Sequence, residues 1–106
     1  MASERRGVMV LMYDLPRGTA EERKNAADFR KNLLKCGYMM LQESVYIKLM
    51  RNREYSAAEL WSIKSFIPPA GDIRAFDMSL NEFEMMQTLL GETINLDLFA
   101  GDMIFA

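Results

Sequence analysis

The fold is decided by residues 7–14, Gly-Val-Met-Val-Leu-Met-Tyr-Asp. Apolar side chains fill both alternating sets of positions in this run, a pattern typical of a strand that is buried on both faces. Leu15-Pro16 and Gly18 follow directly and predict a loop, because proline and glycine interrupt regular structure. We therefore expect residues 7–14 to form the central strand of a sheet.

A helix is expected after this loop. Thr19 and Glu22 have the spacing of a capping box, in which two side chains satisfy backbone N–H groups at a helix start. Gly37 predicts the end of the helix. Apolar residues recur at helical spacing on one face and charged residues on another: Ala26, Phe29, Leu33 and Cys36 on the first, Lys24, Asp28, Lys31 and Lys35 on the second.

Residues 38–49 are rich in strand-forming residue types, and Gln42-Glu43-Ser44 is their only polar interruption. We predict two strands that are joined there by a tight turn or a bulge. The interruption contains no glycine or asparagine, the residues that the tightest hairpin turns favour, so a single bent strand is the alternative.

A second helix and a further strand are expected next. Ser56 and Glu59 have the capping-box spacing, and the apolar stripe that follows them ends at Pro68-Pro69, which stop a helix. Residues 72–78 are expected to form the next strand.

The last part of the chain predicts a short helix and an edge strand. Ser79 and Glu82 form a third capping-box pattern, and Gly91 is expected to end the helix that they begin. Residues 94–99 then alternate between apolar and polar side chains, as a half-buried strand does.

The predicted order of elements is β-α-β-β-α-β followed by a helix and a strand, which is an α+β, ferredoxin-like arrangement. We expect a single domain over residues 1–106, with its core over about residues 7–90. Two helices would cover one face of the sheet and leave the other face apolar, so we expect a two-fold homodimer to cover it. The residues expected at that interface are Val8, Val10, Met12, Tyr46, Ile94, Leu96 and Leu98.

Composition excludes several classes of enzyme. The 106 residues include one cysteine and no histidine, which rules out an internal disulfide, a paired-cysteine zinc site and catalysis by histidine. There is no glycine-rich phosphate-binding motif, and no nucleotide or organic cofactor is expected. No apolar run approaches the roughly 20 residues of a membrane span, so we expect a cytoplasmic protein without a membrane partner.

Positive charge is concentrated in one half of the chain. Basic residues outnumber acidic ones 11 to 6 in residues 1–53, whereas they are outnumbered 2 to 9 in residues 54–106. The first half is therefore a candidate polyanion surface, with a solvated helix face as the plain alternative. The candidate DNA-binding residues are Arg17, Lys48, Arg51 and Arg53 near loops and Arg23, Lys24, Arg30 and Lys31 on the first helix.

Asp14 is the candidate metal ligand and catalytic residue, because it ends the central strand just before a Pro-Arg-Gly loop. Magnesium usually takes one or two carboxylates together with waters or phosphates, so Asp14 from both protomers could supply the pair. The alternative is that Asp14 stabilises the turn before Pro16 by an Asx-type hydrogen bond.

Five stretches together resemble the CRISPR-associated protein two family, and the likeness is closest to its type II members. They are Val-Leu-Met-Tyr-Asp-Leu-Pro (10–16), Thr-Ala-Glu-Glu-Arg-Lys (19–24), Phe-Arg-Lys-Asn-Leu-Leu-Lys-Cys-Gly-Tyr (29–38), Met-Leu-Gln-Glu-Ser-Val-Tyr (40–46) and Pro-Pro-Ala-Gly-Asp-Ile-Arg (68–74). The resemblance implies a ferredoxin-like dimer that bridges dimers of the CRISPR-associated protein one integrase and holds a duplex DNA prespacer for insertion at the repeat DNA.

The resemblance also implies a metal-dependent endonuclease, for RNA or DNA, in which Asp14 matches the metal residue. It further implies that residues 94–99 pair with the sheet of the partner. The acidic second half departs from this pattern because it is a poor DNA surface by charge, and we expect it to face the integrase or solvent. Three hypotheses therefore stand: an architectural DNA-binding subunit, a magnesium-dependent endonuclease centred on Asp14, and a ferredoxin-like regulatory or interaction module.

Overall fold

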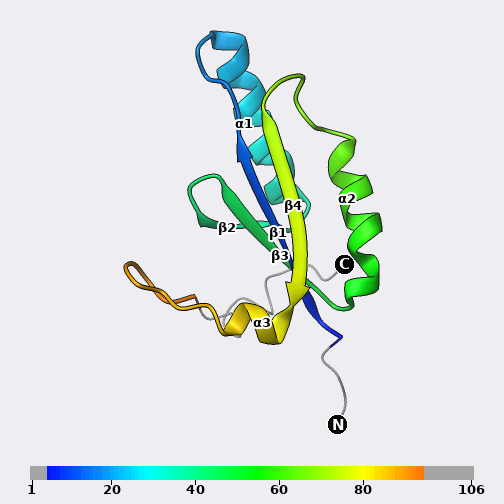
Figure 1. Ribbon diagram of the computed structural model, residues 1–106. Coiled ribbons are helices and arrows are strands. Elements are labelled where there is room, and N and C mark those ends of the chain that lie inside the picture. The colour runs from blue at the N-terminus through cyan, green and yellow to red at the C-terminus, as the bar shows by residue number, and fades with distance from the viewer. Residues whose placement is uncertain (1–4, 95–106) are drawn as a thin grey trace.

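The computed structural model describes residues 5–94 and shows the predicted α+β order of elements (Figure 1). No helix in this part of the chain has the length and apolar character needed to cross a membrane. The predicted strand over residues 94–99 falls, after Ile94, outside the described residues. The elements are β1 (Gly7–Asp14), α1 (Ala20–Lys35), β2 (Met39–Gln42), β3 (Val45–Met50), the 3-10 turn η1 (Arg53–Tyr55), α2 (Ser56–Lys64), β4 (Asp72–Ser79) and α3 (Leu80–Glu84).

The four strands form one antiparallel sheet in the order β2-β3-β1-β4, so β1 is central, as predicted. Helices α1 and α2 lie against one face of this sheet (Figure 1). Phe29 and Leu33 of α1 and Ile63 of α2 are buried there against Met9 and Leu11 of β1. Each fully buried side chain of this size stabilises the fold by about 1.5–3 kcal/mol.

Tyr46 also lies in this core and is only 1% exposed. The expectation that it contributes to a dimer interface is therefore corrected. Tyr46 pairs with Leu11 in the β1–β3 register, and both side chains point toward the helices. Because side chains alternate between the two faces of a sheet, this register directs Tyr46 away from the opposite face.

Helix α3 covers part of the opposite face. Leu80 and Phe83 pack there in a second buried cluster that contains Val8 and Val10. These two valines are 0% and 7% exposed, which corrects the expectation that they lie at a dimer interface. Met12 on the same face is 40% exposed and stays available for contact with another molecule.

Two of the three predicted capping boxes are confirmed, at Thr19 with Glu22 and at Ser79 with Glu82. The third is wrong: the Ser56 hydroxyl donates to the carbonyl oxygen of Arg53 instead of capping α2. Glu59 points into the protein and is buried. Helices α2 and α3 are also shorter than predicted, ending at Lys64 and Glu84.

The two-strand prediction for residues 38–49 is confirmed. Ser44 adopts the left-handed conformation (φ 64°) at the turn, and a register shift lies between Met40 and Gln42. The turn therefore forms without glycine, because a serine takes the left-handed position and a bulge adjusts the strand.

Candidate functional site

Asp14 lies at the end of β1, exposed on the face opposite α1 and α2. The antiparallel β1–β4 register places it directly opposite Asp72, which is also exposed. Side chains at such directly opposed positions lie on the same face of a sheet. The structure thus brings two carboxylates of one chain together at one end of the sheet, and the sequence alone did not indicate Asp72 as the neighbour.

Gly71 allows the loop before β4 to approach the end of β1. Its φ is 117°, and a Cβ atom added there would lie 2.8 Å from the carbonyl oxygen of Asp14 and 2.7 Å from Cδ2 of Leu15. Such contacts leave no room for a side chain, and the left-handed conformation favours glycine. The glycine of the Pro-Pro-Ala-Gly loop is therefore the local signal that this loop packs against Asp14.

The Asp14 carboxylate accepts no hydrogen bond from any residue in 5–94, so the expected Asx-type alternative is not found there. Its oxygens are available to a cation from solvent. Across the same residues, no group of three or more acidic, histidine or cysteine side chains is placed to hold a metal ion. Two carboxylates suit magnesium only when waters, a phosphate or a partner chain supply its other ligands.

Two of the candidate basic residues on α1 make local contacts. A terminal guanidinium nitrogen of Arg23 (Nη1) donates to the carbonyl oxygens of Arg17 and Gly18, at 3.2 and 3.5 Å. Lys24 forms an ion pair of 3.3 Å with Asp28, as the spacing allowed, and its side chain is 76% exposed. A pair this exposed contributes only about 0.2–0.5 kcal/mol to stability. Because its side chain is largely exposed, Lys24 remains accessible to solvent despite the pair.

Lys48 is not on the surface, which corrects its assignment as a DNA contact. It is 6% exposed, and its ammonium group donates to both carboxylate oxygens of Glu59, at 3.0 and 3.1 Å. Like Tyr46, it sits on the helix-facing side of β3, where α2 supplies the carboxylate. Burial, together with the Glu59 charge, raises the pKa of the adjacent Tyr38 well above its usual value.

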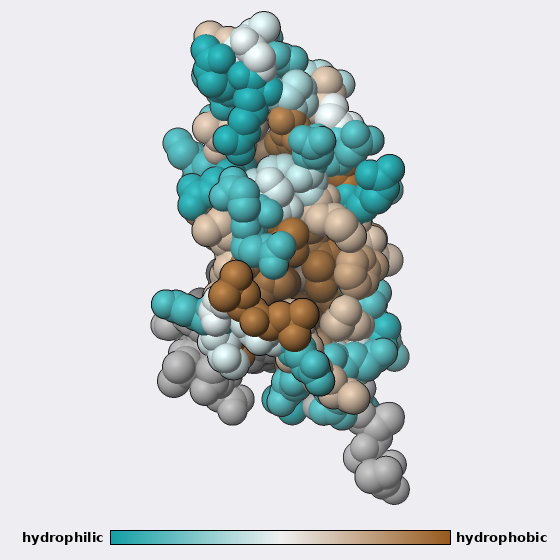
Figure 2. Space-filling view, turned by 60° about the vertical axis from the view of Figure 1, so that its left-hand side comes forward, coloured by the Kyte–Doolittle hydropathy of each residue, from teal (hydrophilic) through white to brown (hydrophobic). Residues whose placement is uncertain are grey.

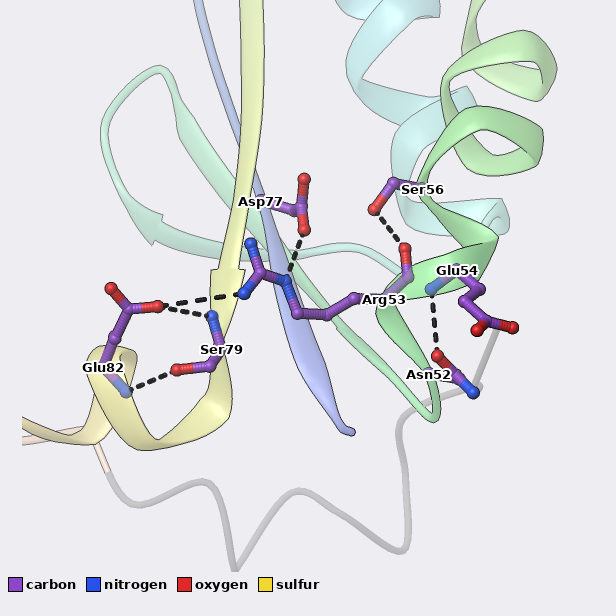
Figure 3. Close-up of polar contacts among 7 residues, drawn as sticks. All are labelled: Asn52, Arg53, Glu54, Ser56, Asp77, Ser79 and Glu82. Atoms are coloured by element: carbon purple, nitrogen blue, oxygen red, sulfur yellow. Dashed lines mark hydrogen bonds and ion pairs between the residues drawn. The ribbon is translucent and has the colours of Figure 1, made fainter. Parts of the chain in front are cut away.

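Arg53 of η1 contacts acidic residues of both β4 and α3 (Figure 3). Its Nε donates to a carboxylate oxygen of Asp77 on β4 at 2.8 Å, and its Nη1 lies 3.9 Å from Glu82 on α3. Hydrogen bonds from Ser79, and secondarily the Arg53 charge, hold the pKa of Glu82 below its usual range. Because two carboxylates already compensate Arg53, its role in the structure is to link η1, β4 and α3.

The remaining basic candidates are exposed. Arg17 lies in the loop after β1, Arg30 and Lys31 lie on α1, and Arg51 follows β3. One of them has a fixed partner: Arg30 donates from Nε to the Tyr46 hydroxyl at 2.8 Å. No ion pair joins Arg17 or Arg30 to a carboxylate within the described part of the chain.

Comparison with known proteins gives one family. The family model of CRISPR associated protein Cas2 matches residues 8–86. Three relatives, each named "CRISPR-associated endoribonuclease Cas2", are similar to the chain over most of its length. The protein from Streptococcus mutans is 42% identical over 84 residues, which are 79% of this chain and 78% of the relative. The protein from Ligilactobacillus salivarius is 35% identical over 86 residues, 81% of this chain and 85% of the relative. The protein from Campylobacter jejuni is 37% identical over 83 residues, 78% of this chain but only 58% of that longer relative.

Proposed function

The chain belongs to the CRISPR associated protein Cas2 family, and we propose that it is the DNA-binding architectural subunit of the CRISPR adaptation complex. In this proposal a homodimer bridges dimers of the CRISPR-associated protein one integrase. The dimer holds duplex prespacer DNA while the integrase inserts it at the repeat DNA. The protein supplies surface, shape and charge, and the integrase supplies the strand transfer.

The observation that carries this proposal is a set of exposed positive groups for which the described part of the chain offers no ion-pair partner. Arg17, Arg30 and Lys31 are exposed, and none of them pairs with a carboxylate of residues 5–94. Guanidinium and ammonium groups of this kind contact phosphates and hold a duplex without reading its sequence. The buried Lys48 and the compensated Arg53 are not part of this surface.

An apolar patch supports self-association. It lies on the face opposite α1 and α2, and Figure 2 shows a cluster of hydrophobic residues surrounded by hydrophilic ones. Phe76 is 44% exposed and Met85 78% exposed, beside a groove of about 370 Å³ that Val10 and Phe83 help to line. Exposed apolar surface of this kind is typical of a contact with another protein, and a second copy is the occupant that a two-fold dimer provides.

The test combines oligomeric state and DNA binding. Analytical ultracentrifugation of the full chain is expected to give a dimer, and duplex DNA is expected to bind with an affinity that falls steeply as salt rises. The double variant Arg17→Glu, Lys31→Glu is expected to lose most of this binding and to abolish integration in a reaction with the purified integrase. The single variants Arg17→Glu and Lys31→Glu are compared with Lys64→Glu on α2, the matched control that reverses one charge elsewhere. Unchanged integration by the double variant would contradict the proposal.

A second candidate function is a magnesium-dependent endonuclease, favoured by the Asp14 carboxylate, which accepts no hydrogen bond within residues 5–94 and lies opposite Asp72. We propose Asp14 as the metal ligand, joined by Asp72 of the same chain or by Asp14 of the partner. Magnesium bound there would stabilise the charge that develops on a phosphate during hydrolysis. The chain's own contribution would be to bind the cation with carboxylate oxygens and to hold the nucleic acid with its arginines.

This candidate is tested with Asp14→Asn, which keeps size and removes the charge. Calorimetric titration with magnesium is expected to show binding by the wild type and none by the variant. RNA and duplex DNA are then assayed for cleavage with magnesium and with a chelator. Cleavage that survives in Asp14→Asn or in the chelator would come from a contaminant and would remove this function.

A further inference from the structure

One arginine lies on the same face of the sheet as the two aspartates at the end of β1 and the start of β4. Arg74 is two residues along β4 from Asp72, which pairs with Asp14 in the β1–β4 register. Side chains two residues apart on a strand point to the same face of a sheet. Ile73 and Ala75, on either side of Arg74, pack toward α1 and α2. Arg74 therefore lies on the face opposite the helices, as Asp14 and Asp72 do.

The register brings the Arg74 guanidinium within reach of both carboxylates. Residues two apart on one strand are separated by about 7 Å, which is the relation of Arg74 to Asp72. Diagonal neighbours across an antiparallel pair are about 7–8 Å apart, which is the relation of Arg74 to Asp14, and long side chains span such distances. The residue directly opposite Arg74 is Met12, which carries no charge. The charged neighbours of Arg74 in the β1–β4 register are therefore the two aspartates.

Arg74 brings the one basic side chain that β1, β3 and β4 place on this face. Apart from the two aspartates, the other residues of these strands on the same face are apolar. Arg74 is exposed, and its guanidinium forms no ion pair with a carboxylate of residues 5–94. Arg53, by contrast, is held by Asp77 and Glu82. The N–H donors of Arg74 are thus available to a ligand that comes to Asp14 and Asp72.

The charges at this end of the sheet identify the ligand. Asp14 and Asp72 carry two negative charges, which are balanced by one magnesium ion. A phosphodiester then adds one negative charge, and Arg74 supplies the one positive charge that balances it. Without Arg74 the assembled groups would carry an excess negative charge, which opposes binding of the phosphate. A planar guanidinium also donates paired hydrogen bonds to two phosphate oxygens.

We propose that Arg74 binds the scissile phosphodiester of a nucleic acid beside Asp14 and Asp72, as a catalytic residue of the candidate endonuclease. This inference rests on the magnesium-dependent function proposed above and names the group that recognises the substrate at that site. In the hydrolysis, the oxygen of a water molecule bonds to phosphorus and the bond from phosphorus to one sugar oxygen breaks. That sugar oxygen leaves as a hydroxyl with a proton from the water. Arg74 donates hydrogen bonds to the non-bridging oxygens, which carry negative charge during this exchange.

The first measurement is the affinity of the full chain for magnesium, by calorimetric titration. Arg74→Ala removes a positive charge beside the two carboxylates, so magnesium is expected to bind about twofold to fivefold more tightly. Arg74→Lys keeps the charge and is expected to bind magnesium as the wild type does. Lys35→Ala is the matched control, because it removes one positive charge in the last turn of α1, on the other face of the sheet and at the far end from Asp14 (Figure 1). It should leave the affinity unchanged.

The second measurement is the binding of a dinucleotide in the presence of magnesium, by nuclear magnetic resonance titration. A dinucleotide carries one phosphodiester, so it reports on this site without also covering the basic residues of α1. The probes are thymidylyl-thymidine and a uridine dinucleotide with a methylated 2′-hydroxyl, which distinguish DNA from RNA. Arg74→Ala is expected to weaken binding of the preferred dinucleotide about tenfold, the effect of losing hydrogen bonds to a charged group. Arg74→Lys should restore part of this affinity, and Lys35→Ala should not change it.

The opposite signs of the two effects distinguish substrate contact from a merely structural role. A damaged site would bind both magnesium and the dinucleotide more weakly, and that result in Arg74→Ala would overturn the inference. Inorganic phosphate that binds as tightly as the preferred dinucleotide would indicate a free-phosphate site and would also overturn it. Analytical ultracentrifugation of Arg74→Ala is expected to match the wild type. A changed oligomeric state would assign Arg74 to a contact with a second copy instead.

The same measurements separate this inference from the function on which it rests. If the wild type binds magnesium but dinucleotide affinity does not depend on Arg74, only this inference fails. If the wild type binds no magnesium, the candidate endonuclease function fails and the inference fails with it. Thermal unfolding of each variant verifies that it is folded, which is expected because Arg74 is exposed.

Discussion

Lys48 and Glu59 form an ion pair in which the lysine ammonium contacts both carboxylate oxygens, at 3.0 and 3.1 Å, and each side chain is only 8% exposed. This contact joins β3 to α2 across the core, 11 residues apart in the sequence. A buried charge is costly unless it is paired, so the two residues depend on each other.

Removing one partner of this pair is therefore expected to destabilise the protein strongly. Glu59→Ala and Lys48→Ala should each lower the free energy of unfolding by about 3–5 kcal/mol, because each leaves an uncompensated buried charge. The double variant Lys48→Met, Glu59→Leu should be close to wild type in stability. Urea unfolding followed by circular dichroism measures all three. Single variants as stable as the double variant would show that the pair is not buried in solution.

Gly71 provides a second test of the fold near Asp14. Gly71→Ala is expected to destabilise by more than 1 kcal/mol, because alanine is strained at φ 117° and its Cβ would meet Asp14 and Leu15. Gly91→Ala is the matched control, since its φ is 112° but a Cβ there would meet no atom of residues 5–94 within 4 Å. The difference in unfolding free energy between the two variants isolates the steric contact. Equal effects would mean that the loop does not pack on the end of β1.

Tyr13 predicts a loss of stability at high pH. The pKa of its phenol is raised from 10.0 to about 12, so the folded state favours the neutral form. Above pH 10 the unfolded chain gives up this proton more readily than the folded chain, and stability falls between about pH 10 and 12. Thermal unfolding measured across that range is expected to show a smaller decrease in Tyr13→Phe than in the wild type. The same decrease in both would assign the effect to another group, with Tyr38 as the next to test.

Local signals in the sequence were sufficient for the order of elements. The capping boxes at Thr19 and Ser79 are short-range contacts within four residues, so the residue pattern determined them. The capping box predicted at Ser56 does not form, because Glu59 pairs with Lys48 of β3 instead of with the start of its own helix. A buried ion pair between a strand and a helix leaves no periodic signature in the sequence.

The site depended on strand register, which the sequence did not specify. Tyr46 and Lys48 were assigned to the surface or to an interface, but the β1–β3 pairing turns them toward α1 and α2. The proximity of Asp14 and Asp72 also follows from strand pairing, because these two residues are 58 positions apart in the sequence and meet only in the β1–β4 register. Asp14 itself was identifiable, because its place at the end of an apolar run is a local feature. Its neighbours required the three-dimensional structure.

Glu43 gives the sharpest electrostatic prediction. It is exposed at the β2–β3 turn, next to Ser44, whose carbonyl oxygen accepts a hydrogen bond from the Tyr13 backbone N–H. The Tyr13 ring stacks on Tyr46, whose hydroxyl accepts a hydrogen bond from Arg30. Glu43→Gln removes a negative charge from the turn beside the tyrosine pair that contacts Arg30 of the proposed DNA surface, so duplex DNA is expected to bind about twofold to fivefold more tightly at low salt, as the loss of one exposed like-charge repulsion implies. Since exposed charges are screened over about 10 Å at 0.1 M salt, the gain should shrink as salt rises. Glu84→Gln makes the same change on α3, which packs at the Ser79 end of β4 rather than beside α1 and the β2–β3 turn, and should leave the affinity unaltered. A gain of equal size in both variants would reflect net charge alone and would contradict DNA contact at Arg30.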